Sequence, residues 1–510
     1  MLAKVFSAAL VGLEAHLIEV EVDISGGLPQ FSVVGLPDAT VRESRDRVRA
    51  ALKNSGFQFP VKKITVNLAP AGVKKEGSGL DLAIALAVLV AEQVLPAEAV
   101  KNDVIVGELS LDGRVKPISG ALSIGMACLN SHRLLVPAEN ATEAALAGRA
   151  VVFSIHTLPE AVEFLRGAHC LDPTVVDRAA YFAFHTGCEE EDFDDICGQD
   201  SAKRAFEIAA AGAHNVLMVG PPGAGKTMLA RRLPSILPPF QTEEALETSR
   251  IYSVAGQLEG GYPLLMARPF RAPHHSISEA GLIGGGTIPK PGEVSFAHNG
   301  VLFLDEAAEF NRSVLDSLRQ PLEQGSVTVT RVSGSLRYPA RFMFVAAMNP
   351  CPCGYYGDRS KNCVCSPAQI RRYRGRLSGP LMDRLDLHLD VPAVPPRELR
   401  EDRPSGESSA LIRTRVMAAR ARQTQRFKRD GIHTNSQLSP RLLKKYCPLD
   451  SVGRDLLEQA LTRLGLSARA YGRIVRVART IADLAGCDMI AATHLAEAIQ
   501  YRGLDRHLEF

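Results

Sequence analysis

The sequence has no long apolar run, no strong excess of one charge and no export signal near its start. Its longest purely apolar stretch, Leu82–Ala91, holds ten residues, about half of what a membrane-spanning helix requires. Glu14 lies where a signal peptide needs an apolar core. Lysine plus arginine (59) nearly balance aspartate plus glutamate (56), so a nucleic-acid role would have to come from local clusters. These absences predict a cytoplasmic protein without a transmembrane helix.

The composition is that of a globular protein, with 46% apolar and 23% charged residues. The length of 510 residues suggests about three domains, at roughly 150 residues each. Ten cysteines occur in a chain without an export signal. They are therefore expected as free thiols or metal ligands rather than as disulfides.

The pattern along the chain divides it into four segments. Residues 1–168 alternate strand-like runs with an apolar helix and predict an α/β domain, and residues 169–192 end in an acidic run typical of a linker. Residues 193–396 alternate apolar strands and helices around Gly/Pro-rich turns and predict an enzymatic α/β core. Residues 397–510 start with a polar, breaker-rich stretch and then show helical periodicity, which predicts a helical lid. In the first segment the expected strands are His16–Asp23, Lys63–Leu68 and Asp103–Leu109, and the expected helix is Leu80–Val90.

A phosphate-binding loop follows the short apolar strand at residues 217–219. The pattern GxxxxGK[ST] is complete and stands between a strand and a helix, as the motif requires. Its glycines let backbone N–H groups converge on phosphate at a helix N-terminus, the lysine reaches the β/γ-phosphates, and the threonine hydroxyl holds Mg²⁺. The predicted ATP-binding residues are Gly220, Pro221, Pro222, Gly223, Ala224, Gly225, Lys226 and Thr227.

Two later apolar strands end in polar residues. Asp305 and Glu306 follow the strand at residues 300–304, where paired carboxylates are costly unless a metal or a proton-transfer role offsets their repulsion. Asp305 is the predicted Mg²⁺ partner, and Glu306 is predicted to polarise the attacking water. The alternative is a pair of acids stabilised at a helix N-terminus. Asn349 ends the next strand, within reach of the γ-phosphate or the water, although Asn-Pro alone is a turn signal.

Together these motifs resemble the AAA+ ATPases, and in particular their magnesium-chelatase-like group. Further segments carry the resemblance, namely Gly198-Gln199, Arg268–Ser276, Gly284–Gly286 and Pro291–Glu293. The resemblance implies an α/β fold with an AAA+ P-loop ATPase core and a C-terminal helical lid, preceded by a Lon protease-like α/β domain. It also implies ATP and Mg²⁺ as cofactors, a homo-oligomeric ring expected to be a hexamer, adenine packing at Gly198 and Gln199, and Asn349 as the first sensor.

The same resemblance assigns roles to arginines. Arg384, in the segment GPLMDRLDL, matches the arginine that a neighbouring subunit contributes to the site. Such an arginine couples hydrolysis to assembly, because the transferring phosphoryl group meets the cation only between stacked subunits. The open alternative is a salt bridge from Arg384 to Asp383 or Asp386 in its own chain. Arg469 is the better match to the second sensor, with Arg473 as the reserve.

A predicted β-hairpin at residues 325–339 resembles one that points into the channel of replicative helicase rings. Arg331 and Arg337 flank its turn and are the predicted DNA contacts, unless the hairpin is merely solvated. The basic clusters Arg371–Arg376 and Arg413–Arg429 are further candidates for DNA binding, with a solvated helix face as the alternative for each.

The Lon-like domain has lost its expected catalytic dyad. A Lon-type protease needs a serine nucleophile and a lysine base within hydrogen-bond reach. Gly79 stands at the serine position with Ser78 one residue early, and Leu122 stands at the lysine position. We therefore expect a scaffold or docking module rather than a peptidase.

Four cysteines follow Asn349 closely. Cys351, Cys353, Cys363 and Cys365 form two CxC pairs that would suit a tetrahedral zinc site, with free thiols in an insertion as the alternative. The adjacent His274 and His275 are expected to be structural, since neighbouring side chains on a strand or loop usually point apart.

The leading functional hypothesis is an ATP-driven motor on single-stranded or branched DNA. The resemblance specifies helicase or branch-migration activity in recombination during natural transformation. A chelatase-like protein-remodelling ATPase is the alternative, and an ATP-dependent peptidase is disfavoured by the missing dyad.

Overall fold

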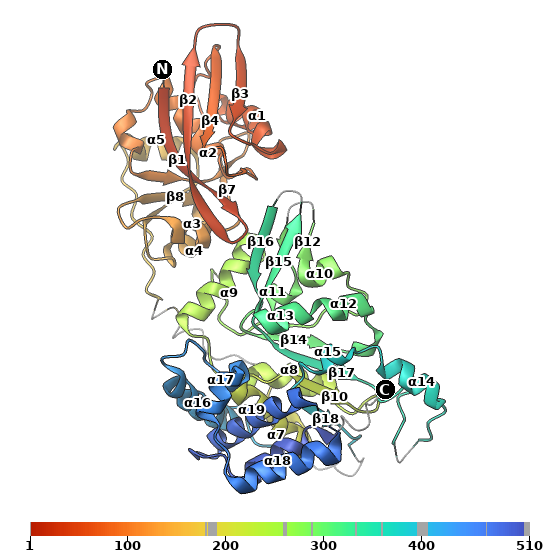
Figure 1. Cartoon of the computed structure of the whole chain (residues 1–510). Helices are drawn as coiled ribbons and strands as arrows, with labels where there is room; N and C mark the ends of the chain where they lie inside the picture. The colour runs from red at the N-terminus through yellow and green to blue at the C-terminus, as the bar shows by residue number, and fades with distance from the viewer. Residues whose placement is uncertain are drawn as a thin grey trace. The chain divides into compact units, whose positions relative to one another are not determined.

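The computed structural model describes residues 2–178, 181, 191–258, 263–286, 289–331, 334–358, 361–394, 406–465 and 467–503. The chain forms two compact units (Figure 1). Met1–Thr186 and Gln241–Met266 make up the first unit, and Gly187–Phe240 and Ala267–Phe510 make up the second. Gln241–Met266 lies within the range predicted for the ATPase core, so the first unit takes a segment from the middle of the chain.

The first unit contains a mixed seven-stranded sheet in the order β3-β4-β2-β1-β5-β8-β9. β1 and β2 form a long antiparallel hairpin, and β5, β8 and β9 run parallel to one another. The strands are β1 Leu2–Val11, β2 Glu14–Ser25, β3 Gln30–Val34, β4 Lys63–Ala69, β5 Asp103–Ile105, β8 Arg133–Pro137 and β9 Val151–Ile155, with a small hairpin of β6 Glu108–Leu109 and β7 Val115–Lys116. The predicted strands correspond to β2, β4 and β5–β6, and each lies within one or two residues of the expected position or divides in two.

Six helices of this unit pack on its sheet or on one another in the part of the chain that the structure describes. They are α1 Ala39–Asn54, α2 Asp81–Ala91, α3 Ala121–Ala127, α4 Ala141–Ala145, α5 Leu158–Leu165 and α9 Thr242–Ala255. Every residue of α2 is buried, so the longest apolar run of the sequence forms a core helix. In the part of the chain that the structure describes, no helix has both the length and the hydropathy to cross a membrane. The distant helix α9 is fixed to this unit by Gly120 N–H donating to Ser253 O (3.0 Å) and Arg250 Nη2 donating to Leu13 O (2.9 Å).

The second unit is built on a five-stranded parallel sheet in the order β11-β14-β17-β10-β18. The strands are β10 Val216–Val219, β11 Phe270–Arg271, β14 Val301–Leu304, β17 Met343–Met348 and β18 Leu387–Asp390. All residues of β10, β14 and β17 are buried, the pattern of a parallel sheet covered on both faces. Because the strands are parallel, the residues that follow β10, β14 and β17 meet at one edge.

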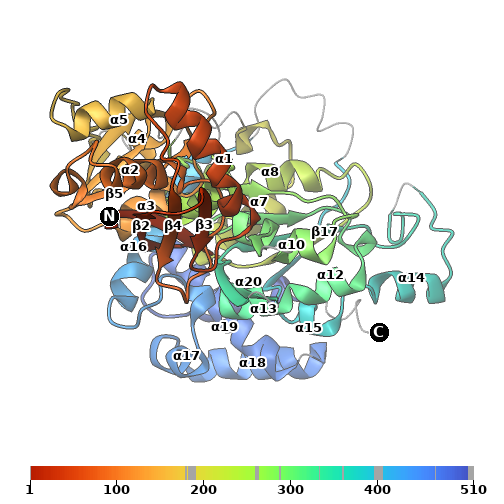
Figure 2. The same cartoon turned by 90° about the horizontal axis from the view of Figure 1, so that it is seen from above.

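Helices and two hairpins surround this sheet. The helices are α7 Asp200–Gly212, α8 Lys226–Ile236, α10 Glu279–Ile283, α11 Glu293–Phe296, α12 Arg312–Ser317, α13 Arg319–Gln324, α14 Pro367–Arg374 and α15 Gly379–Met382. The hairpins pair β12 Gly284–Gly285 with β13 Lys290–Pro291, and β15 Ser326–Arg331 with β16 Gly334–Pro339. Figures 1 and 2 both show α14 at the outer margin of this unit.

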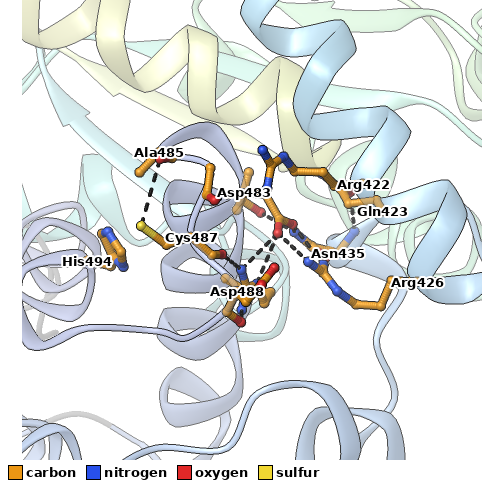
Figure 3. A network of polar contacts seen from close by, with 12 residues as sticks. Arg422, Gln423, Arg426, Asn435, Asp483, Ala485, Cys487, Asp488 and His494 are labelled. Atoms are coloured by element: carbon orange, nitrogen blue, oxygen red, sulfur yellow. Dashed lines mark hydrogen bonds and ion pairs between the residues drawn. The ribbon is translucent and has the colours of Figure 1, made fainter.

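The C-terminal helices gather beside α7 (Figure 1). They are α16 Ser409–Phe427, α17 Pro440–Tyr446, α18 Ser451–Leu464, α19 Ala468–Leu484 and α20 Ala492–Gln500. A buried polar network joins α16 to α19 (Figure 3). Asp483 accepts from Arg479 Nη2 (2.9 Å), Arg426 Nη1 (2.9 Å) and Asn435 Nδ2 (2.9 Å).

This network changes the interpretation of the basic helix at Arg413–Arg429. Its arginines bind acceptors within the same unit, as the following contacts show: Arg413 to Ser235 O, Arg415 to Glu207 and Glu407, Arg420 to Ala210 O, Arg422 to Gly486 O, and Arg426 to Asp483. The helix therefore uses most of its positive charge to pack against α7, α8 and α19.

The acidic run at the end of the predicted linker also packs. Asp192 Oδ1 accepts from Ser409 N–H (2.8 Å), and Asp195 lies 3.0 Å from Arg232. Phe193, between them, is fully buried. These acids therefore hold the start of α16 against α8.

Candidate nucleotide-binding site

The phosphate-binding loop lies between the buried strand β10 and helix α8. Gly220 must be glycine, because a Cβ there would lie 2.1 Å from the carbonyl oxygen of Val391. Gly223 and Gly225 have φ values of 78° and 85°, the left-handed region that glycine enters without strain. The loop therefore turns sharply and starts α8 at Lys226.

Lys226 is 8% exposed, and its ammonium group lies within the loop. Its Nζ donates to the carbonyl oxygens of Gly220 (2.7 Å) and Pro221 (2.9 Å) and to Asn349 Oδ1 (3.1 Å). Burial lowers the pKa of Lys226, while the charges of Asp305 and Glu306 oppose that shift. The structure thus joins the loop lysine to the predicted sensor from the neighbouring strand β17.

Thr227 and Asp305 meet at the same edge of the sheet. The Thr227 hydroxyl donates to Asp305 Oδ2 at 2.7 Å. A hydroxyl and a carboxylate are the hard oxygen ligands that Mg²⁺ prefers, so these two residues fit a Mg²⁺ site beside bound phosphates.

Glu306 is exposed and has a φ of 49°, which is uncommon for a residue other than glycine. Its N–H donates to Asp305 Oδ1 at 2.9 Å.

Gln199 connects the predicted adenine segment to the loop. Gln199 has a φ of 58° and Gly198 a φ of 61°, so the chain turns here before α7. Gln199 Nε2 donates to Ala224 O (3.3 Å) and to Pro392 O (2.7 Å). The structure therefore brings Gly198 and Gln199 beside the phosphate-binding loop.

Tyr373 is a residue that the sequence reasoning missed. This tyrosine of α14 is buried, and its hydroxyl oxygen accepts a hydrogen bond from the backbone N–H of Asn349. Burial, with further contributions from Glu309 and Glu306, raises its pKa to about 12. The only sequence signal was a single tyrosine within the basic helix, which gave no reason to place it near the site.

The predicted finger and second-sensor arginines form a separate patch. Arg384 hydrogen-bonds Pro380 O and Glu323, and its side chain is 15% exposed. Arg469 Nη1 lies 2.7 Å from Asp383 Oδ2, and its side chain is 73% exposed. Within the described part of the chain, neither arginine contacts the loop, Asp305 or Asn349. The alternative of a salt bridge to Asp383 or Asp386 is therefore not what holds Arg384.

Arg473 has a structural partner. It pairs with Asp386, which also lies 3.3 Å from His214 Nδ1. Burial would raise the pKa of Asp386, yet the charge of Arg473 and the hydrogen bond from His214 hold it well below its usual range. Since His214 Nε2 in turn lies 2.8 Å from Thr480 Oγ1, this buried set joins β18 to α19.

The hairpin arginines are only partly described. Arg337 is exposed, lies opposite Thr328, and donates from Nε to Ser326 Oγ at 3.0 Å. Arg331 ends β15 opposite Gly334, but its side chain and the turn at 332–333 lie outside the described residues.

The basic cluster Arg371–Arg376, after the cysteines, is only partly exposed. Arg371 and Arg372 are exposed, whereas Arg376 binds Ala308 O and Glu309.

The positions at which a Lon-type dyad would be expected hold no pair of nucleophile and base among the described residues. The Ser78 hydroxyl donates to Glu108, and Leu122 is fully buried in α3.

The four cysteine side chains lie close together: their Sγ atoms are all within 4.8 Å of one another. The rings of His274 and His275 lie side by side, with centroids 4.0 Å apart and planes tilted by 35°, so the expectation that these side chains point apart is wrong. His274 Nδ1 lies 2.8 Å from Ser276 Oγ.

The parallel sheet and the loop lysine, threonine, aspartate and asparagine at its carboxyl edge define a P-loop ATPase of the AAA+ type. Three family matches cover most of the chain. Residues 192–399 match "Magnesium chelatase, subunit ChlI", residues 20–140 match "Subunit ChlI of Mg-chelatase", and residues 406–502 match "Magnesium chelatase, subunit ChlI C-terminal". The chain belongs to the ComM/YifB family of magnesium-chelatase-like proteins.

Its full-length relatives establish that membership. The protein YifB of Salmonella typhimurium is 46% identical over 99% of this chain and 98% of its own length. The competence protein ComM of Haemophilus influenzae is 46% identical over 100% of this chain and 99% of its own length. The magnesium-chelatase 67 kDa subunit of Chlorobaculum parvum is 31% identical over 31% of this chain and 23% of its own length. Family and site together indicate an ATPase that uses ATP and Mg²⁺.

Proposed function

We propose that this protein is a ring-forming, Mg²⁺-dependent AAA+ ATPase that moves on branched DNA during competence. The observation that carries the ATPase part is the meeting of Lys226, Asn349, Thr227 and Asp305 at one sheet edge. The DNA part rests on the full-length similarity to a relative named competence protein ComM.

Each residue of the site has a defined role in this proposal. Lys226 holds the β/γ-phosphates, and Thr227 and Asp305 would hold Mg²⁺, which neutralises charge on the phosphates when bound. Glu306 accepts a proton from the attacking water, since its exposed carboxylate stands at the tip of β14. Asn349 orients the γ-phosphate, and its contact with Lys226 links the two groups before ATP arrives.

Arg384 acts across a subunit boundary. Among the described residues, neither Arg384 nor Arg469 contacts the nucleotide residues of its own chain, and Arg469 pairs with Asp383, the residue next to Arg384. Both arginines therefore serve the site of the same neighbouring subunit. Arg384→Ala chains should bind ATP but hydrolyse it slowly, and mixing them with Lys226→Ala chains should restore turnover, because some intact loops then receive an intact arginine. Mixed rings without rescue would show that Arg384 only holds Glu323.

We assign DNA contact to Arg331 and Arg337 of the β15–β16 hairpin. The exposed Arg371 and Arg372 of α14 are further candidates for DNA contact. The basic helix α16 is not part of this surface, because its arginines are engaged within the unit. Four-way DNA should stimulate ATP hydrolysis, and replacing Arg331 and Arg337 with Ala should remove that stimulation while basal turnover persists. Arg312→Ala, on another exposed segment, is the control.

A chelatase-like remodelling ATPase is the second candidate. The observation that favours it is the match of all three chelatase descriptions, including one that covers residues 20–140 of the first unit. In that case a partner protein, and not DNA, would stimulate hydrolysis. Measuring ATP turnover with four-way DNA, single-stranded DNA and no DNA separates the two, since a rate independent of DNA contradicts the motor.

A further inference from the structure

The four cysteines after Asn349 lie at metal-binding distances from one another. The Sγ atom of Cys351 is 3.3 Å from that of Cys353 and 3.7 Å from that of Cys363, and Cys353 and Cys363 are 3.6 Å apart. With Cys365 included, all four sulfurs fall within 4.8 Å. Four thiols from two CxC pairs thus surround one point.

These distances fit a tetrahedral thiolate site. A Zn–S bond of about 2.3 Å requires sulfurs about 3.8 Å apart in a tetrahedron. A disulfide requires about 2.05 Å, much less than any sulfur pair here. Four protein ligands also leave no open position, the mark of a structural site and not a catalytic one.

The surroundings suit the negative charge of such a site. Cys365 N–H donates to Cys363 Sγ at 3.4 Å, and backbone groups at Tyr355 and Val364 hydrogen-bond to Cys353. Backbone donors of this kind orient metal-bound sulfur and compensate its charge. The described residues between 350 and 376 include a single acid, Asp358, against five basic residues: Lys361, Arg371, Arg372, Arg374 and Arg376.

The cysteine segment lies next to the nucleotide site, as three observations show. Cys351 is buried and stands two residues after Asn349, which accepts from Lys226. A Cβ on Gly354 would lie 2.6 Å from Pro222 Cδ, so the chain directly after the first CxC pair packs against the phosphate-binding loop. On the far side of the cluster, α14 begins two residues after Cys365 and carries Tyr373 to Asn349.

We propose that Cys351, Cys353, Cys363 and Cys365 bind one Zn²⁺ that closes this segment and fixes Asn349 and Tyr373 against the phosphate-binding loop. The cysteines are positioning residues, since they act on the nucleotide through Asn349 and Pro222. The metal site does not depend on any role in DNA binding, so it and the proposed function can fail separately.

Metal analysis of untagged protein purified in reducing buffer is the first test, and it needs neither nucleotide nor DNA. About one zinc per chain is expected. Protein that contains no zinc and takes up none from a zinc buffer would overturn the proposal. Replacing zinc with Co²⁺ should give the intense visible absorption of tetrahedral thiolate coordination, and the weak spectrum of an octahedral oxygen site would also overturn it.

Variants separate ligation from folding. Cys365→Ser should lose zinc, whereas Cys365→His should keep it, because histidine is also a zinc ligand. Cys170→Ser, which changes an exposed cysteine outside the cluster, should keep it too. ATP turnover of Cys365→Ser should fall by about 10- to 100-fold, since misplacing a positioned group by about 1 Å has an effect of that order. Equal zinc content in Cys365→Ser and wild type would exclude Cys365 as a ligand and overturn the four-cysteine site.

Discussion

Two buried lysines, one in each unit, have similar contacts and different surroundings. Lys226 donates to the carbonyl oxygens of Gly220 and Pro221, and Lys75 donates to those of Gly35 and Pro70. Burial lowers the pKa of both. Lys226 also reaches Asn349 and lies in the field of two carboxylates, whereas no carboxylate contributes to the shift of Lys75.

The two lysines differ in whether a ligand could replace the carbonyl oxygens that accept their hydrogen bonds. The partners of Lys226 belong to a glycine loop at a helix N-terminus, where a phosphate can replace the carbonyl oxygens as acceptor. Lys75 is fully buried and links two separate turns of the first unit. Buried charge therefore marks a binding site in one unit and a structural contact in the other, and the surrounding backbone distinguishes them.

The largest effect is expected from Lys226→Ala. Loss of charged hydrogen bonds to phosphate, worth about 3 kcal/mol, should weaken ATP binding by about 100-fold or more, and turnover should disappear with it. Titration with a fluorescent ATP analogue measures the affinity. Lys444→Ala, on the exposed face of α17, should bind ATP normally. Normal affinity in Lys226→Ala would remove the contrast between the two lysines.

Glu306→Gln should separate binding from hydrolysis. The amide keeps the shape of the side chain but cannot accept the proton of the attacking water, so turnover should fall by about 10²- to 10⁴-fold while ATP still binds. Steady-state turnover and equilibrium binding are measured on the same preparation. Glu279→Gln, at the exposed start of α10, is the control. Turnover like that of wild type would exclude the assigned role of Glu306.

Lys75→Met should destabilise the first unit without affecting the nucleotide. It removes the ammonium donor from the carbonyl oxygens of Gly35 and Pro70, of which Pro70 O keeps only the 3.4 Å hydrogen bond from Val73 N–H, and this loss costs about 1–3 kcal/mol. Hydrogen exchange in β4 and α2 should become faster, whereas exchange in β10 and α8 and the affinity for ATP should not change. A loss of ATP affinity would show that the two lysines act together.

The same variant carries a pH signature. Because burial lowers the pKa of Lys75, the unfolded chain holds the lysine proton up to a pH of about 10.4, where the folded chain has begun to release it. Stability of the first unit should therefore rise with pH between the folded-state value and the unfolded one. Lys75→Met should lack that rise, and equal slopes in the two proteins would contradict the buried lysine.

The smallest effect is expected from Ser78→Ala. Its hydroxyl donates to Glu108 at a half-buried position, so its loss should change stability by about 1 kcal/mol or less. ATP turnover should be unchanged, and no casein cleavage should be seen before or after the change. Peptidase activity that disappears in Ser78→Ala would mean that the first unit has kept a nucleophile.

Local motifs predicted the parts of the site that are contiguous in sequence. The strand-loop-helix at 217–227 and the polar ends of β14 and β17 were recognisable from the sequence. In each, the polar or glycine residues directly follow an apolar strand, so their chemical role can be inferred from the local sequence alone. Parallel strands then bring the three together at one edge. The strands and the core helix of the first unit were found for a similar reason, because their apolar periodicity is local.

Partnerships between distant residues were not predictable. Nothing in the neighbourhood of Arg384 indicates Glu323, 61 residues earlier, and nothing near Tyr373 indicates Asn349. The helical pattern of α9 does not show which of the two units it will pack in. The arginines of α16 resembled a DNA-binding face because their acceptors, such as Ala210 O and Gly486 O, are backbone atoms that a sequence does not display.

The short segment from Asp383 to Asp386 has a mechanical consequence. Arg469 and Arg473, one turn apart on α19, are ion-paired to its two ends, and Arg384 lies between those ends. The start of α19 and Arg384, the arginine assigned to the neighbouring subunit, are thus connected through these two ion pairs and should move together. A rotation of the C-terminal helices would therefore displace Arg384, and under the proposed function it would couple the conformation of one subunit to ATP hydrolysis in the next.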